Sequence, residues 1–144
     1  MNGVEMLKQQ HREVERLFEQ FDAARSMQQR HEVFRKLADA LAVHAVVEEQ
    51  DFYPAVNQRG TSEKVLESVE EHLEIQRLLA RMLLLASDDE RFDRSMKVLR
   101  QNVAHHVAEE EHDLFPQVER LFDEKTLARI ADAIARTQND LIGG

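Results

Sequence analysis

The sequence predicts an all-α protein, an antiparallel up-down-up-down four-helix bundle with a shorter C-terminal fifth helix. The 144 residues include only four glycines and two prolines, and 33% of them are charged, a composition typical of long helices with few turns. Apolar residues recur at steps of three and four along most of the chain, which is the spacing of one helical face. Four such segments with short connections bury their apolar faces most simply as antiparallel neighbours.

The first two helices are expected before residue 57. The first carries an apolar stripe and ends in the polar stretch 26–30. The second begins at about His31 and runs to Phe52, where Pro54 bends or ends it before the loop 57–62. The stripe of the first helix consists of Val4, Leu7, Val14, Phe18 and Phe21.

The remaining helices follow the loop. A third is expected over residues 62–86, and its broad apolar face is either buried in the bundle or forms a homodimer contact. The acidic stretch 87–90 supplies an N-cap and a favourable charge for a fourth helix that continues to Pro116. The fifth, over about 124–142, is expected to pack outside the bundle.

The length and composition limit the classes of protein to which the chain can belong. The length fits a single domain, residues 1–144, with the bundle over about 4–118. A net charge of −9 without a basic run argues against nucleic acid and anionic membranes as partners. The chain lacks cysteine, and its longest apolar run, residues 82–86, is far short of the ~20 residues of a membrane span. Because Glu5 and Lys8 stand where a signal peptide is apolar, we expect a soluble cytoplasmic protein.

Ionisable residues fill the gaps in the apolar stripes of all four bundle helices. The series at three- and four-residue steps skips one or two positions in each helix, and a histidine or glutamate stands there. These residues are therefore expected to point at one axis. They are His11, His44, Glu48, His72, His106 and Glu110.

The spacing of these residues favours a metal site. His44 with Glu48 and His106 with Glu110 are four residues apart, so each pair projects together. A lone buried histidine is usually a hydrogen-bonded core residue, and a single His-x-x-x-Glu is often a surface pair. Half a dozen uncompensated buried ions would exceed a typical total stability of roughly 5 to 15 kcal/mol. A bound cation is the simplest compensation.

An internal repeat involves the same positions. Residues 11–17 resemble residues 72–78, and residues 44–54 resemble residues 106–116, at offsets of 61 and 62. Two helical hairpins of one design would face each other about a pseudo-twofold axis, each supplying two histidines and one carboxylate. This symmetry predicts two metal ions bridged by the two glutamates.

The other histidines lie outside this pattern. His105 and His112 flank Glu109 beside the core stripe, where they are either solvated or adjacent to ligands, and His31 is expected at the surface. Glu109 and His112 form the Glu-x-x-His element that ferritin-like diiron proteins use twice, but it occurs once here. A ferritin-like site is therefore disfavoured.

At the six inward positions the sequence resembles the hemerythrin-like family of HHE cation-binding domains. The family pattern is a histidine, His-x-x-x-Glu, a histidine and His-x-x-x-Glu on successive helices, and it covers residues from about 4 to 118 here. The resemblance implies a non-haem diiron centre with an oxo or hydroxo bridge. The implied ligands are His11 and His44 on one iron, His72 and His106 on the other, and Glu48 and Glu110 bridging.

The sequence departs from the oxygen-carrying members at one position. These have a further histidine four residues after the one on the third helix, where this chain has Gln76. The repeat counterpart of Gln76 is Glu15, which is placed to reach the other iron. Some members use a tyrosine near the end of the second helix at the metal. Tyr53 is placed similarly, although its helical-wheel position does not point clearly inward.

Three functions remain open at this stage. The first is a diiron protein that binds or reacts with dioxygen, peroxide or nitric oxide in sensing or protection, since open metal positions favour reaction. The second is iron storage or donation, and the third is an interaction module that a metal stabilises. Imidazole and carboxylate ligands suit iron, manganese or zinc, and only the resemblance favours iron. Any enzymatic activity is expected to be redox chemistry at the metal, such as peroxide breakdown.

Overall fold

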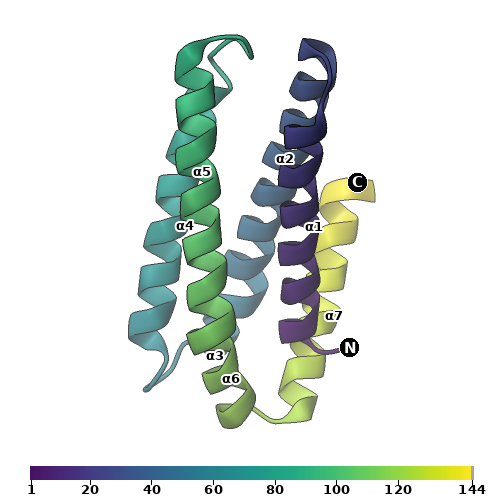
Figure 1. The fold of residues 1–144 in the computed structure, drawn as a ribbon. Coiled ribbons are helices and arrows are strands. Elements are labelled where there is room, and N and C mark those ends of the chain that lie inside the picture. The colour runs from purple at the N-terminus through teal and green to yellow at the C-terminus, as the bar shows by residue number, and fades with distance from the viewer. Residues whose placement is uncertain (144) are drawn as a thin grey trace.

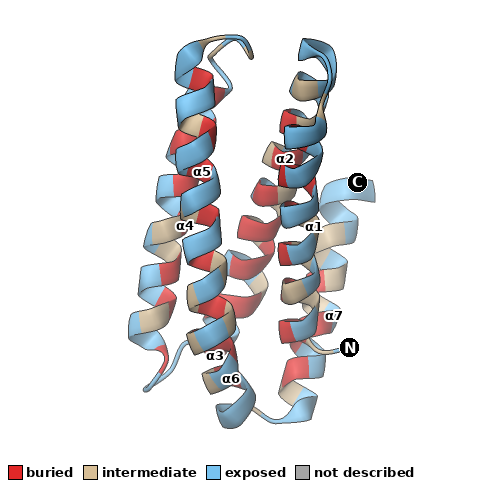
Figure 2. Cartoon of the chain, in the orientation of Figure 1, coloured by how far each residue is buried: buried red, intermediate tan, exposed pale blue. Residues whose placement is uncertain are grey.

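All regular secondary structure in the described part of the chain, residues 1–143 of a computed structural model, is helical. Four long helices run alternately up and down side by side (Figure 1), which confirms the predicted bundle. Their inward faces carry the buried residues and their outward faces are exposed (Figure 2). The four helices are α1 (Gly3–Ala23), α2 (Met27–Val47), α4 (Ser62–Met82) and α5 (Glu90–Glu109).

Two helix boundaries differ from the sequence-based expectation. Helix α2 begins at Met27, not near His31, because the Ser26 side chain accepts a hydrogen bond from the Gln29 N–H and caps the first turn. Helix α4 ends at Met82, four residues earlier than expected. There the backbone tightens into i to i+3 bonds, from the Leu84 N–H to Arg81 and from the Leu85 N–H to Met82. Leu84 consequently lies at the surface, 88% exposed.

Each of the two helices that carry a His-x-x-x-Glu pair widens into a π-helical turn. The first turn, η1 (Glu48–Phe52), joins α2 to α3 (Tyr53–Val56), and the second, η2 (Glu110–Leu114), joins α5 to α6 (Phe115–Leu121). A proline is the second residue of the helix that follows each turn, Pro54 in α3 and Pro116 in α6. In a regular α-helix the proline ring would clash with the carbonyl group four residues earlier. Widening the turn relieves that clash, so the helix continues past Pro54 where the sequence indicated a bend or an end.

Helix α7 (Glu124–Gly143) packs outside the bundle against α1 (Figure 1), as predicted. It has 20 residues, one fewer than α1, and is shorter than the continuous α2–α3 and α5–α6 helices. Its apolar face buries Leu127, Ile130 and Ile134. A Cβ atom at Gly3 would lie 2.6 Å from Cγ2 of Ile130, so this glycine permits the close approach of α1 and α7.

The core consists of two apolar clusters stacked along the bundle. One fills the end where α1 meets α2 and includes Phe18, Phe34 and Phe92, whereas the other packs around Phe52 and Phe115 and includes α7. The predicted ligand positions lie between the two clusters. Hydrocarbon therefore surrounds the polar residues on both sides along the bundle axis.

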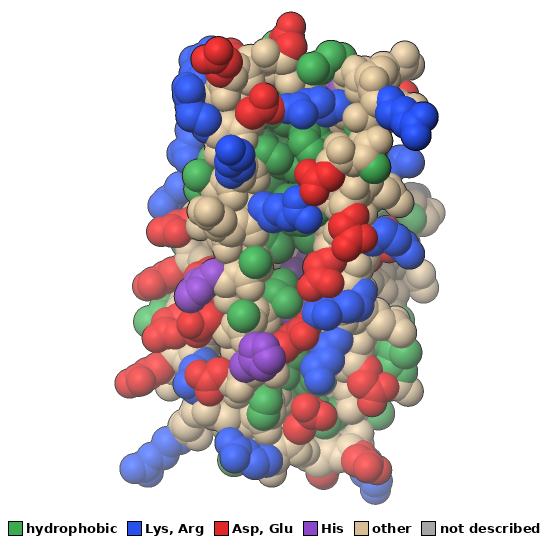
Figure 3. Space-filling view, in the orientation of Figure 1, with side chains coloured by type: hydrophobic (Ala, Val, Ile, Leu, Met, Phe, Trp, Pro, Cys, Tyr) green, Lys and Arg blue, Asp and Glu red, His purple; other side chains and the backbone are tan. Residues whose placement is uncertain are grey.

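The outer surface is largely charged. On the face formed by α1 and α5, acidic and basic side chains line both sides of a strip in which hydrophobic side chains are visible (Figure 3). None of the helices in residues 1–143 is both long and apolar enough to span a lipid bilayer.

Candidate metal centre

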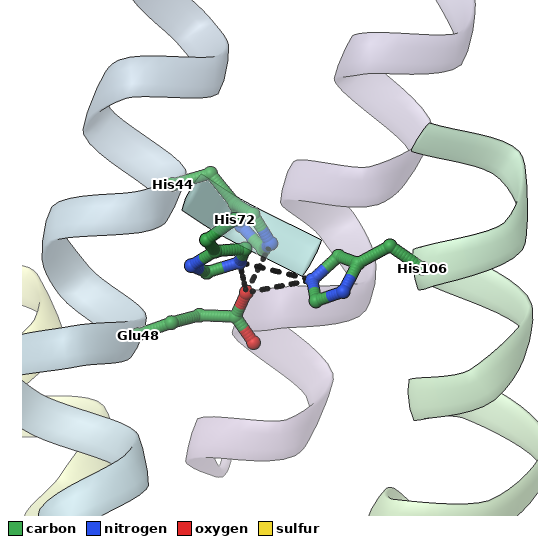
Figure 4. A group of neighbouring side chains, drawn as sticks. All are labelled: His44, Glu48, His72 and His106. Carbon is green, nitrogen blue, oxygen red and sulfur yellow. Dashed lines mark hydrogen bonds and ion pairs between the residues drawn. The ribbon is translucent and has the colours of Figure 1, made fainter. Parts of the chain in front are cut away.

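The six ionisable residues of the core stripes meet at one level of the bundle. Their side chains are buried, with exposed fractions between 0% and 5%. Donor atoms within 4.8 Å of one another form two overlapping groups that share His44 and Glu48. Figure 4 shows the first group, in which side chains from three helices and the η1 turn converge on one point. The groups are His44, Glu48, His72 and His106, and His11, His44, Glu48 and Glu110.

Each carboxylate contacts histidines from both halves of the bundle. Glu48 Oε1 lies 2.7 Å from His44 Nε2 and 2.9 Å from His72 Nε2. Glu110 Oε1 lies 3.1 Å from His11 Nε2 and 3.3 Å from His106 Nε2. Separations of about 3 Å are those of neighbouring ligands that lie about 2.1 Å from one ion in octahedral geometry. Each glutamate is thus positioned to share a metal ion with histidines from both halves of the bundle.

An outer acceptor orients every histidine of the cluster through its other ring nitrogen. The Nδ1–H of His11 donates to Glu111 at 2.6 Å, and that of His106 donates to Glu71 at 2.8 Å. The remaining two are the 3.3 Å bond from His72 Nδ1–H to Glu49 and the 2.6 Å bond from His44 Nδ1–H to Gln10. Carboxylate and amide oxygens accept only, so they fix the proton on Nδ1 and direct the Nε2 lone pair inward.

Two buried side-chain atoms at the centre lack a hydrogen-bond partner among the described residues. They are His44 Nε2 and Glu48 Oε2. Burial lowers the pKa of His44, which favours the neutral ring. With the proton held on Nδ1 by Gln10, His44 Nε2 presents a lone pair to Glu48 Oε1 at 2.7 Å. Two lone pairs facing each other between buried side chains are stabilised by a cation between them, so the residues fit a metal ion.

The electrostatic environment shifts the pKa values of the other residues in the cluster. Burial disfavours charge on His11, but bonds to Glu110 and Glu111 outweigh it and raise the pKa of His11 to about 9. The same competition raises the pKa of His72 and, more strongly, that of His106. Burial also opposes ionisation of Glu48, yet the neighbouring histidines hold its pKa well below its usual value. Protons on these histidines therefore compensate the carboxylates when no metal is bound.

Tyr53 belongs to the cluster, which its helical-wheel position did not indicate. In a regular α-helix a residue five positions after Glu48 points about 140° away from it. In η1 the Tyr53 N–H instead donates to the Glu48 carbonyl, five residues earlier, and the wider turn brings both side chains to one face. Tyr53 is 3% exposed, and its hydroxyl donates to Glu110 Oε2 at 2.7 Å. Burial and the two carboxylates raise the pKa of Tyr53 well above its usual value.

The two halves of the repeat differ at this position. Phe115 stands where Tyr53 stands in the other half, and its ring stacks on His11 with centroids 5.8 Å apart and an interplanar angle of 8°. Because phenylalanine has no hydroxyl, Glu48 Oε2 lacks the bond that Glu110 Oε2 accepts from Tyr53. The pseudo-twofold site is therefore chemically unequal on its two sides.

The other sequence candidates lie away from the donor atoms. Glu15 does not reach the centre, because its side chain is 53% exposed and pairs with Arg12. Gln76 is exposed on α4 beside a cavity. His31 and His112 are exposed, and His105, on the surface of α5, lies 3.1 Å from Glu71.

Comparison with known proteins agrees with this geometry. The model of the hemerythrin HHE cation-binding domain matches residues 2–118 of the chain. The chain belongs to this family. An HHE domain is a cation-binding domain, and the buried cluster of histidines and glutamates suits metal binding. No curated protein matches the chain.

One solved HHE structure has the same fold. It is the crystal structure of a hemerythrin HHE cation-binding domain-containing protein from Mycobacterium kansasii. The TM-score is 0.85 at 22% sequence identity, and the match covers 96% of this chain and 86% of the other. The match includes the C-terminal part of this chain, beyond the residues of the family model, so it supports the five-helix arrangement.

Proposed function

We propose that this HHE domain is a non-haem diiron protein that binds or reacts with a small oxidant, such as dioxygen, peroxide or nitric oxide, in sensing or protection. The observation that carries the proposal is the orientation of the histidines. All four donate Nδ1–H to outer acceptors and aim Nε2 at two carboxylates. Such a set of nitrogen and oxygen donors holds iron readily. The family resemblance selects iron over manganese or zinc.

The repeat supports an assignment of ligands to two ions. One ion would be held by His11 and His44 and the other by His72 and His106. Glu48 and Glu110 would bridge them, since each carboxylate contacts one histidine of either pair. Tyr53 would lie on the side of His72, because its hydroxyl is 3.5 Å from His72 Nε2.

If bound, iron would supply electrons for chemistry with a small oxidant. The chain's own residues keep the site ready for it. The two apolar clusters flank the centre along the bundle axis, and the outer acceptors hold the imidazole rings in one tautomer. Tyr53 holds a proton on its hydroxyl, which it shares with Glu110. The oxygen-carrying members have a further histidine where this chain has the exposed Gln76. The missing ligand would leave a metal position open, which favours reaction with the oxidant over reversible oxygen binding.

Iron content tests the proposal directly. The purified protein is reconstituted with ferrous iron without oxygen, and iron per chain and the visible spectrum are measured before and after exposure to each oxidant. We expect two irons per chain and a spectrum that changes with oxidant. The double variant His72→Ala/His106→Ala should lose iron, whereas the surface control His112→Ala should keep both ions. An iron-free wild-type protein, or full retention by the first variant, would contradict the proposal.

A surface feature favours iron donation or storage as the second candidate. A depression of about 260 Å³ between α4 and α5 is lined by five glutamates and His105, among them Glu67 and Glu74. Glu71 connects it to the interior, since its two oxygens contact exposed His105 and buried His106. Negative charge at this place attracts cations. Slower iron uptake in Glu67→Gln/Glu74→Gln and rapid loss of iron to a mild chelator would support this function over oxidant chemistry.

A further inference from the structure

A long cavity opens beside the histidine cluster, and it is much larger than a diatomic ligand. Its volume is about 650 Å³, within the roughly 300 to 1,000 Å³ of pockets that hold organic molecules. All four clustered histidines line one end. The surrounding wall is apolar and includes Leu41, Ile75, Leu79 and Val103. A space of this size is not required for dioxygen, peroxide or nitric oxide.

The cavity is elongated along the bundle between α2 and α4. On α2 its lining extends from His31 to Val46, which is 15 residues and corresponds to about 22 Å at a rise of about 1.5 Å per residue. The α2 wall carries the small residues Ala38, Ala42 and Ala45, which leave room between the two helices. Exposed Ala42 on α2 and Ala80 on α4 lie along its solvent side. A cavity with this elongated lining fits a linear chain.

Charged groups mark the end away from the histidine cluster. Arg35 lines the cavity, is exposed, and has no ion pair or hydrogen bond with any residue in 1–143. His31 lies one helical turn further on, where Ser87 Oγ is 3.4 Å from its Nδ1. Asp39, one turn nearer the cluster, is the acidic residue of the lining. The free guanidinium provides two parallel N–H donors suited to a carboxylate.

We propose that this cavity binds an unbranched aliphatic carboxylate, with its carboxylate at Arg35 and its hydrocarbon chain extending between α2 and α4 toward His44 and His72. Nine residues separate Arg35 from His44, which is about 13 Å along α2. A saturated chain advances about 1.3 Å per carbon, because each C–C bond is about 1.5 Å long. A chain of ten to twelve carbons therefore spans the distance, and dodecanoate is the appropriate probe. The inference goes beyond the proposed function and does not depend on the identity of the metal.

Calorimetric titration with dodecanoate tests the inference, both on the protein as purified and after iron loading. We expect saturable binding of one molecule per chain. Each methylene removed, in the series dodecanoate, decanoate and octanoate, should weaken binding about fourfold because apolar burial falls. Dodecanol and dodecyltrimethylammonium should bind more weakly than dodecanoate. Absence of saturable binding, affinity that does not depend on chain length, or tighter binding of the ammonium compound overturns the inference.

Matched variants locate the site. Arg35→Gln should weaken dodecanoate binding roughly tenfold, the loss expected for a charge-assisted pair, while Lys36→Gln on the same helix removes an equal charge outside the cavity. Ala42→Leu should narrow the gap and weaken binding at least tenfold, whereas Ala104→Leu, exposed on α5, should not. If a variant and its control weaken dodecanoate binding equally in either pair, the proposed location of the site is overturned. If iron binding is normal and dodecanoate fails to bind, only this inference is lost; if iron fails to bind while dodecanoate binds, only the proposed function is lost.

Discussion

Removing the metal should make the stability of this protein fall as the pH rises from 6.5 to 9. His11 carries the effect, because its pKa is raised from 6.5 to about 9 in the folded protein by Glu110 and Glu111, against the opposing effect of burial. A histidine whose pKa is higher in the folded state contributes stability that is complete below the unfolded value and disappears as the pH passes the folded value. The contribution is about 3 kcal/mol, since each pKa unit is about 1.4 kcal/mol.

The neighbouring groups do not reverse this trend. The pKa values of His72 and His106 are also raised, so these two histidines likewise contribute less free energy of unfolding as the pH rises. His44 has the opposite sign, but its lowered pKa costs stability only as the pH falls below about 6.5. Tyr53, with its raised pKa, contributes a loss only above about pH 10. Between pH 6.5 and 9 the net change is therefore a decrease.

Urea unfolding of the chelator-treated protein measures the effect. At a slope of about 2 kcal/mol per molar urea, the loss of about 3 kcal/mol lowers the midpoint by about 1.5 M between pH 6.5 and 9. The metal-loaded protein should show a smaller change, because coordination through Nε2 holds the imidazole rings neutral at both pH values. Glu111→Gln should also reduce the change, since it removes one of the two carboxylates that raise the pKa of His11. A metal-free midpoint that stays constant or rises over this range would refute the reasoning.

Three further substitutions test other parts of the structure. Tyr53→Phe leaves the buried oxygen of Glu110 without its donor and should cost about 2 kcal/mol of unfolding free energy in the metal-free protein, measured in urea; an unchanged midpoint would contradict the assigned bond. Gln10→Glu places a carboxylate against Nδ1 of His44 and should tighten metal binding about tenfold in chelator competition, whereas equal or weaker affinity would show that this outer acceptor does not tune the site. Gly3→Ala forces a methyl group into a side chain of α7 and should cost about 1 kcal/mol after a helix-propensity gain of similar size, seen as a lower Tm; a higher Tm would mean that propensity outweighs the clash.

The sequence alone determines the fold class and the six inward residues, because both depend on local periodicity. A step of three or four residues places side chains on one helical face whatever the partner helix is. His44 and Glu48 therefore share a face before any tertiary contact is known, and the second pair repeats this spacing at residues 106 and 110. The structure brings all six together at one level.

Only the tertiary structure decides how these residues are supported. The outer acceptors Gln10, Glu49, Glu71 and Glu111 reach histidines on other elements, so no spacing along the chain identifies them. The inward position of Tyr53 depends on a π-helical turn, which changes the direction of every later side chain. The cavity likewise results from small residues of two helices that face each other. Local periodicity fixes which residues share a helical face, whereas the distances between faces are set by the packing of the whole bundle.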